Sequence, residues 1–214
     1  AYTDVGDAGF LGPRYEGVMI IDGKPPANIR RPESVDVAAV TTRDRIRRLT
    51  NKRFLERRSP RSIQSYTESF QKADALMRRR EVFDLDQESA ADRARYGDHH
   101  FGRNCLLARR LVERGVRFIS LYHASWDHHD ALDKDLKYNT SVVDQPVGAL
   151  LKDLKQRGLL EETLIWWGGE FGRTPTAEMP ALNGRDHNHY GFTCLSLIHI
   201  SEPTRRTPIS YAVF

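Results

Sequence analysis

The sequence lacks most features that mark disulfide scaffolds, membrane proteins and strongly basic nucleic-acid-binding proteins. Only two of its 214 residues are cysteine, Cys105 and Cys194, so neither a disulfide framework nor a cysteine-based metal site is predicted. No hydrophobic run is long enough to span a bilayer. The formal net charge is only +4, which by itself does not indicate a nucleic-acid partner.

Two catalytic signatures are also missing. The chain has neither a GxSxG nucleophile elbow nor a glycine-rich phosphate loop. Ser125 lies beside the polar motifs described below, but the sequence shows no base that would activate it, so we do not assign it as a nucleophile. With 39% hydrophobic and 29% charged residues, the composition is that of an ordinary globular domain.

The two ends of the sequence indicate a fragment with an added tail. The chain starts at Ala1, inside loop-like sequence and without an initiator methionine or a targeting signal. Residues 195–214 match the translation of a transposase-type sequencing adapter, and we interpret them as non-native read-through. This tail is therefore left out of the fold prediction.

Composition and periodicity divide the chain into four segments. Residues 1–40 are rich in glycine, proline and turn residues and are expected to be irregular. Residues 41–98 are expected to form a helical segment of the same domain. Residues 99–194 are expected to form the part of an α/β core that carries the site, and residues 195–214 are the adapter-derived tail.

The helical segment is expected to contain two long helices. The first is capped by Thr41 or Thr42 and continues to about Arg58, and the second begins at Ser59-Pro60. Because the first helix is rich in arginine, it could present a nucleic-acid-binding face or a solvated face. It has no interleaved aromatic residues, so we favour the solvated face.

The pattern then changes to alternating helices and strands. A helix over 101–114 is stopped by Gly115, and strands are predicted over 116–122 and 163–167. Between these strands, a helix is expected to begin at Asp144-Gln145-Pro146. A right-handed crossover makes the two strands parallel. The predicted fold class is therefore α/β, with parallel strands and flanking helices after a helical segment.

Acidic and histidine side chains follow both predicted strands. The motif Trp126-Asp127-His128-His129 follows the first strand, and Gly169-Glu170-Phe171-Gly172-Arg173-Thr174-Pro175 follows the second. A third motif, Gly184-Arg185-Asp186-His187, comes shortly afterwards. Because the carboxyl ends of parallel strands meet at one edge of a sheet, we expect these motifs to converge.

The carboxylates and imidazoles of these motifs predict a site for a divalent metal ion such as Zn²⁺ or Mn²⁺. The candidate ligands are Asp127, His129, Glu170, Asp186 and His187, with His123 and His128 as nearby alternatives. Arg173 is the candidate catalytic residue, because its planar guanidinium can clamp an anionic group. Alternatively, the Asp and His side chains serve as loop caps, and Glu170 forms an ion pair with Arg173 or Arg185. We expect Trp166 and Trp167 to lie in the sheet core.

At these three motifs the chain resembles the bacterial DUF1501 family, which is related to the alkaline phosphatase and sulfatase superfamily. The resemblance extends through nearly all of the sequence before the tail, including Gly9-Phe10-Leu11-Gly12 and Phe83-Asp84-Leu85. It implies an alkaline-phosphatase-like core with a divalent metal centre (Zn²⁺, Mn²⁺ or Ca²⁺), and a periplasmic or exported protein. Of the candidate ligands, Asp127, His129, Glu170 and His187 match family positions that correspond to metal ligands of the superfamily.

Two departures from the family pattern bear on activity. Glu170-Phe171 stands where many sulfatases have Asp-His, so one ligand is missing or comes from another residue. The resemblance also implies an upstream Gly-Gly-Pro-Ser-His-x-Asp-Thr segment with another metal acid and the nucleophile. Since this segment is not in the chain, we expect the fragment alone to be inactive.

The favoured function is a metal-dependent hydrolase of sulfate or phosphate esters. Its substrate would be an anionic ester, for example a sulfated or phosphorylated sugar, and no nucleic-acid partner or membrane span is expected. The alternative is a non-catalytic protein that retains the fold to bind polysaccharide or a partner in the cell envelope. The loss of Asp-His at Glu170-Phe171 favours this alternative.

Overall fold

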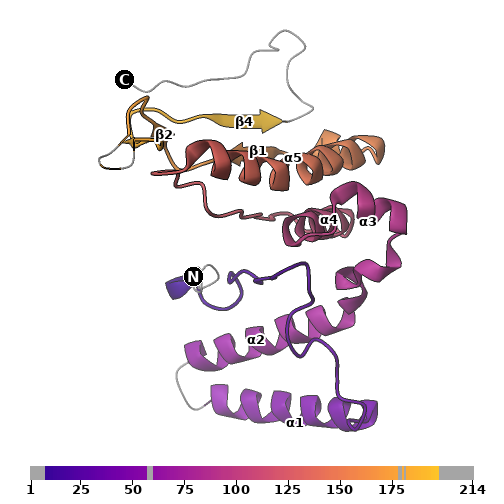
Figure 1. Ribbon diagram of the computed structural model, residues 1–214. Coiled ribbons are helices and arrows are strands. Elements are labelled where there is room, and N and C mark those ends of the chain that lie inside the picture. The colour runs from indigo at the N-terminus through magenta and orange to yellow at the C-terminus, as the bar shows by residue number, and fades with distance from the viewer. Residues whose placement is uncertain (1–7, 57–59, 178–179, 181, 198–214) are drawn as a thin grey trace. The chain divides into compact units, whose positions relative to one another are not determined.

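The computed structural model describes residues 8–56, 60–177, 180 and 182–197 (Figure 1). The chain divides into two compact units, Ala1–Asp84 and Leu85–Phe214. No helix in the described part of the chain is long and apolar enough to cross a lipid bilayer.

Two helices form most of the first unit, α1 (Val37–Leu55) and α2 (Pro60–Arg78). Irregular chain with a short 3₁₀ helix, Gly9–Leu11, comes before them. The prediction that Thr41 or Thr42 caps the first helix is wrong, because α1 already begins at Val37 and the Thr41 hydroxyl donates to the Val37 carbonyl inside it. The predicted cap Ser59 lies outside the described residues.

The two helices of the first unit contact each other mainly through polar and cationic side chains. The guanidinium of Arg47 lies over the ring of Phe70, 4.5 Å from its centroid, and Asn51 donates a hydrogen bond to Thr67. No residue of α1 is buried, and even its apolar side chain Ile46 is 58% exposed. The first helix therefore presents a largely solvated surface.

The second unit contains a three-helix core made of α3 (Ala90–Tyr96), α4 (His100–Glu113) and α5 (Leu132–Gln156). The 3₁₀ helix Leu85–Gln87 precedes α3, and the 3₁₀ helix Leu160–Glu162 follows α5. The predicted helix over 101–114 is confirmed as α4, and Gly115 follows it with a left-handed φ of 77°. The buried core consists of Tyr96, Phe101, Cys105, Leu106, Val143 and Ala149.

The predicted start of the last helix at Asp144 is wrong. Helix α5 begins twelve residues earlier, at Leu132, and Pro146 lies in its interior. Proline removes one helical hydrogen bond, but Val143, Ala149 and Leu154 on the same helix are buried. Apolar packing of this kind, more than local propensity, holds a helix together in a folded protein.

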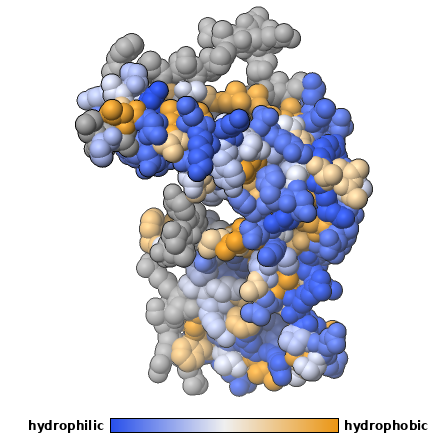
Figure 2. All heavy atoms as spheres, viewed as in Figure 1, coloured by the Kyte–Doolittle hydropathy of each residue, from blue (hydrophilic) through white to orange (hydrophobic). Residues whose placement is uncertain are grey.

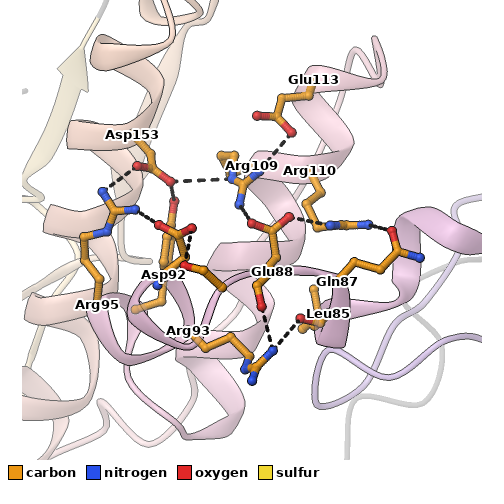
Figure 3. Close-up of polar contacts among 12 residues, drawn as sticks. Leu85, Gln87, Glu88, Asp92, Arg93, Arg95, Arg109, Arg110, Glu113 and Asp153 are labelled. Atoms are coloured by element: carbon orange, nitrogen blue, oxygen red, sulfur yellow. Dashed lines mark hydrogen bonds and ion pairs between the residues drawn. The ribbon is translucent and has the colours of Figure 1, made fainter.

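Buried ion pairs connect the three helices of the second unit (Figure 3). Glu88, just before α3, pairs with Arg109 and Arg110 of α4. Asp153 of α5 accepts a hydrogen bond from the Tyr96 hydroxyl at 2.9 Å and pairs with Arg95. Burial and the neighbouring Asp153 carboxylate raise the pKa of the Tyr96 hydroxyl above its usual value. These ion pairs and this hydrogen bond hold α3 and α5 against α4.

The strands of the second unit pair antiparallel. Strand β1 (Ile165–Gly168) pairs with β4 (Cys194–Leu197), and β2 (Gly172–Arg173) pairs with β3 (His187–Asn188). The first three residues of the predicted tail, 195–197, thus belong to β4, and residues 198–214 lie outside the described residues. The fold is mixed helix and sheet, and the described strands show no parallel pair.

The strand predicted over 116–122 is not observed, because these residues have no assigned secondary structure and no strand partner in the described part of the chain. The parallel arrangement predicted for these residues and 163–167 is therefore not observed, and β1 instead pairs antiparallel with β4. The prediction that Trp166 and Trp167 lie in a sheet core is also wrong, since they are 65% and 45% exposed. Figure 2 shows apolar surface over β4 on the face in view.

Candidate metal centre

The loop between residue 122 and α5 carries the first polar motif in a constrained conformation. Ser125 and Ala131 have left-handed φ values of 72° and 43°, which non-glycine residues adopt only where the surroundings hold them. Within the loop, the N–H groups of His128 and His129 donate to the carbonyls of Trp126 and Asp127. These turns place the side chains of Asp127 and His129 on the same side of the loop.

Asn139 of α5 holds this loop in place through side-chain hydrogen bonds. Its side chain is only 2% exposed, and its amide nitrogen donates to the Ser125 carbonyl and to His128 Nε2 at 3.2 Å. Its amide oxygen lies 3.1 Å from His123 Nε2 and accepts a hydrogen bond from that ring. Two of the candidate histidines, His123 and His128, are therefore occupied as structural partners of Asn139.

The third motif docks directly on this loop. The N–H of Arg185 donates to the His128 carbonyl at 2.8 Å, and the N–H of Leu132 donates to the Asn183 carbonyl at 3.1 Å. Between them, Gly184 is buried, and a Cβ at this position would meet the His129 carbonyl oxygen at 1.8 Å. Only glycine permits this approach.

The short ribbon of β2 and β3 positions the remaining charged groups. Arg173 of β2 and His187 of β3 are cross-strand partners, so their side chains stand next to each other. The Arg173 Nη2 donates to Asp127 Oδ1 at 2.7 Å and to the Trp126 carbonyl at 3.4 Å. The ribbon thereby reaches back to the first loop.

Three side-chain atoms of the kinds that bind metal ions form a nearly equilateral triangle. His187 Nε2 lies 3.0 Å from Asp127 Oδ1 and 2.9 Å from His129 Nε2, and His129 Nε2 lies 3.1 Å from Asp127 Oδ1. The hydrogen bond with His187, followed by that with Arg173, lowers the pKa of Asp127 to about 2. Asp127 is thus a carboxylate at neutral pH.

The triangle has the composition and spacing of a metal-ligand set. One carboxylate oxygen and two imidazole nitrogens lie within 4.8 Å of one another. In an octahedral arrangement with bonds of about 2.1 Å, adjacent ligands lie about 3.0 Å apart, close to the sides of this triangle. In a tetrahedral arrangement they lie about 3.4 Å apart, a few tenths of an ångström more. The residues therefore fit a divalent ion.

A comparison with known protein families shows which family the chain belongs to. The family model described as "Protein of unknown function (DUF1501)" matches residues 1–197. The chain belongs to the DUF1501 family. No curated protein and no solved structure matches the chain significantly. The DUF1501 match includes all residues of the triangle, and it ends three residues into the segment interpreted as adapter-derived.

The structure separates the other two candidate ligands of this DUF1501 chain from the triangle. Glu170 is 66% exposed, and its Oε1 lies 3.9 Å from Arg173 Nη2, a long ion pair. Asp186 Oδ1 accepts a hydrogen bond from the His187 N–H, so it supports the loop. Of the five predicted ligands, the structure thus brings together Asp127, His129 and His187, with Arg173 beside them.

Sequence reasoning missed two residues that build this site. Nothing in the sequence indicated a role for Asn139, because it lies in a stretch that was not expected to be helical. Gly184 is the first residue of the third motif, but its role depends on the backbone of His129, 55 positions earlier in the chain. The ring of Phe171 packs against the ring of His187, with the two ring centroids 4.5 Å apart.

Proposed function

We propose that this DUF1501 protein is a metal-dependent hydrolase of sulfate or phosphate esters. In this proposal Asp127, His129 and His187 hold the metal ion, and Arg173 binds the anionic group of the ester. The observation that carries the proposal is the triangle of donor atoms, with sides of 2.9 to 3.1 Å, next to an arginine.

The chemistry of the triangle favours a cation at its centre. Each imidazole Nε2 carries either one proton or one lone pair in the ring plane, so it bonds well in only one direction. Both Nε2 atoms nevertheless face each other and the same carboxylate oxygen. An ion that faces all three lone pairs would satisfy them together. Two nitrogen ligands favour Zn²⁺ or Mn²⁺ over Ca²⁺, which prefers oxygen.

Arg173 is suited to hold a sulfate or phosphate group. Its Nη2 is used by Asp127, whereas its buried Nη1 has no hydrogen-bond partner among the described residues. A planar guanidinium donates paired hydrogen bonds to such tetrahedral anions. A bound metal ion would supply polarisation of the ester oxygen. Arg173 would orient the anion and neutralise its charge.

Metal binding is the first test. The chelator-treated 214-residue chain is titrated by calorimetry with Zn²⁺, Mn²⁺ and Ca²⁺, beside His187→Ala and the control His189→Ala, whose imidazole is outside the triangle. We expect one ion per chain, and an affinity at least about tenfold lower in His187→Ala alone. Failure to bind any of the three ions, or equal binding by both variants, contradicts the proposed centre.

Turnover is tested with aryl sulfates and aryl phosphates on the metal-loaded product of the natural gene. Hydrolysis that falls in Arg173→Lys, which keeps the charge but loses the planar fork, supports the proposed role of Arg173. Metal binding without hydrolysis of any ester in the panel contradicts the hydrolase.

The alternative is a non-catalytic protein that binds polysaccharide or an envelope partner. It is favoured by the ion pair of Arg173 with Asp127 at 2.7 Å, because this cation competes with a metal ion for the same oxygen. Retention of a sulfated polysaccharide without hydrolysis, and its loss in Arg173→Met, would support this alternative. Both functions imply a periplasmic or exported protein, which fractionation of cells carrying the natural gene tests.

A further inference from the structure

A cleft of about 400 Å³ opens beside the candidate metal centre. Ser125 lines one side of it, two residues before Asp127 on the same loop, and Asp135 and Tyr138 of α5 line another. His100, at the start of α4, completes the wall. The volume falls within the range of small-molecule sites.

The side chains at the mouth of this cleft are available to a ligand. The carboxylate of Asp135 and the hydroxyls of Tyr138 and Ser125 have no hydrogen-bond partner among the described residues. The ring of Tyr138 is 63% exposed, so one of its faces can be covered. The cleft therefore offers a carboxylate, two hydroxyls and an aromatic face.

The deeper wall of the cleft is fixed. Asn139, 2% exposed, bonds to His123 and to the Ser125 carbonyl, which prevents either from turning away. The ring of His100 stacks on that of His123 with centroids 6.0 Å apart. A preformed wall with a few polar groups lowers the ordering cost of binding.

The chemistry of the wall selects among ligand classes. Asp135 is the only carboxylate of the lining and no arginine or lysine accompanies it, so an anionic group is repelled. A simple ammonium ion would use Asp135 and leave the hydroxyls and imidazoles unmatched. A sugar ring presents adjacent hydroxyls to the carboxylate and imidazoles, and its C–H face can cover Tyr138.

We propose that this cleft binds an uncharged sugar ring. The inference rests on the proposed function in one respect: the ring is the alcohol part of the ester whose anionic group meets Arg173. The hydrogen bond from Arg173 to the Trp126 carbonyl joins the two sites, because Trp126 lies between Ser125 and Asp127. The predicted substrate class is thus a sulfated or phosphorylated sugar.

The test measures sugar binding without metal. The chelator-treated chain is titrated with methyl β-D-glucopyranoside, methyl β-D-galactopyranoside and cellobiose, observed by saturation-transfer NMR. We expect at least one of these sugars to saturate, with a Kd of about 1 mM or below. In Asp135→Asn and Tyr138→Ala, binding should weaken about tenfold, because each loses a contact with the ring.

The control is Asp133→Asn, which removes an exposed carboxylate from the same helical turn but outside the cleft. Tyr138→Phe keeps the stacking face and removes only the hydroxyl, so it should weaken binding less than Tyr138→Ala. The inference is overturned if none of the three sugars saturates, or if Asp133→Asn weakens binding as much as Asp135→Asn.

The result is separable from the proposed function. Saturable sugar binding that depends on Asp135, in a chain that binds no metal, supports the cleft and overturns the hydrolase. Metal binding and aryl ester hydrolysis without binding of any of the sugars support the hydrolase and overturn the cleft.

Discussion

Gly184 lies directly against the backbone carbonyl of His129, so that an added Cβ would meet this oxygen at 1.8 Å. The adjacent hydrogen bond from the Arg185 N–H to the His128 carbonyl holds the same two segments together. This close approach places His187, three residues further on, beside His129. The geometry of the candidate metal centre therefore depends on a residue that carries no side chain.

Gly184→Ala is expected to separate the two loops. The added methyl group cannot be accommodated without backbone movement, which costs about 1–3 kcal/mol of unfolding free energy. Urea unfolding measures this loss, and metal affinity should fall with it. The control is Gly169→Ala, because a Cβ at Gly169 meets nothing within 4 Å. Unchanged stability and metal affinity in Gly184→Ala would show that the loops do not meet as described.

Asp127 is expected to titrate well below a free aspartate. The hydrogen bond with His187 and then that with Arg173 hold its pKa at about 2, against 3.8 for an unperturbed carboxyl. A lowered folded-state pKa stabilises the fold above pH 3.8, and this contribution is lost as the pH falls toward 2. In chelator-treated protein, carboxyl ¹³C NMR should show the low pKa, and Arg173→Met should raise it. The exposed charge variant Lys134→Met is the control, and an Asp127 titration near 3.8 in the unmodified chain contradicts the prediction.

Glu88→Gln is expected to destabilise the second unit. Burial alone would raise the pKa of Glu88, but the hydrogen bonds from Arg109 and Arg110 keep it below 4.5. Its contribution to stability is therefore present above pH 4.5 and is lost as the pH falls further. Breaking a buried ion pair from one side costs about 3–5 kcal/mol.

Chemical denaturation of Glu88→Gln at neutral and acidic pH measures this effect. The loss relative to the unmodified chain should be largest at pH 7 and should shrink below pH 4. The exposed Glu162→Gln is the matched control. A Glu88→Gln variant as stable as this control would show that the network contributes nothing.

Asn139→Leu is expected to loosen the loop that carries Asp127. The substitution keeps the volume but leaves the Ser125 carbonyl and the rings of His123 and His128 without their amide partner. Unsatisfied buried polar groups cost about 1–3 kcal/mol each. Thermal unfolding measures the loss, with the exposed neighbour Thr140→Ala as control. Equal melting temperatures for both variants would refute the role of Asn139.

Local patterns in the sequence were sufficient where neighbouring residues decide the structure. The helix over 101–114 was predicted because apolar spacing and Gly115 act within a few residues. The start of α5 was not, because Pro146 and Asp144 resemble a helix start, whereas the burial of Val143 and Leu154 extends the helix past them. A local signal was outweighed by packing that the sequence does not display.

The sequence by itself determined which residue types this protein brings to its candidate site: Asp127, His129, His187 and Arg173 all stand in the three motifs from which the site was predicted. The tertiary structure alone decided that Glu170 and Asp186 lie outside the donor triangle, and that Asn139 and Gly184 hold its loops in place. The physical reason is distance along the chain. Hydrogen bonds and close backbone contacts between segments some 50 residues apart leave no periodic trace in the sequence.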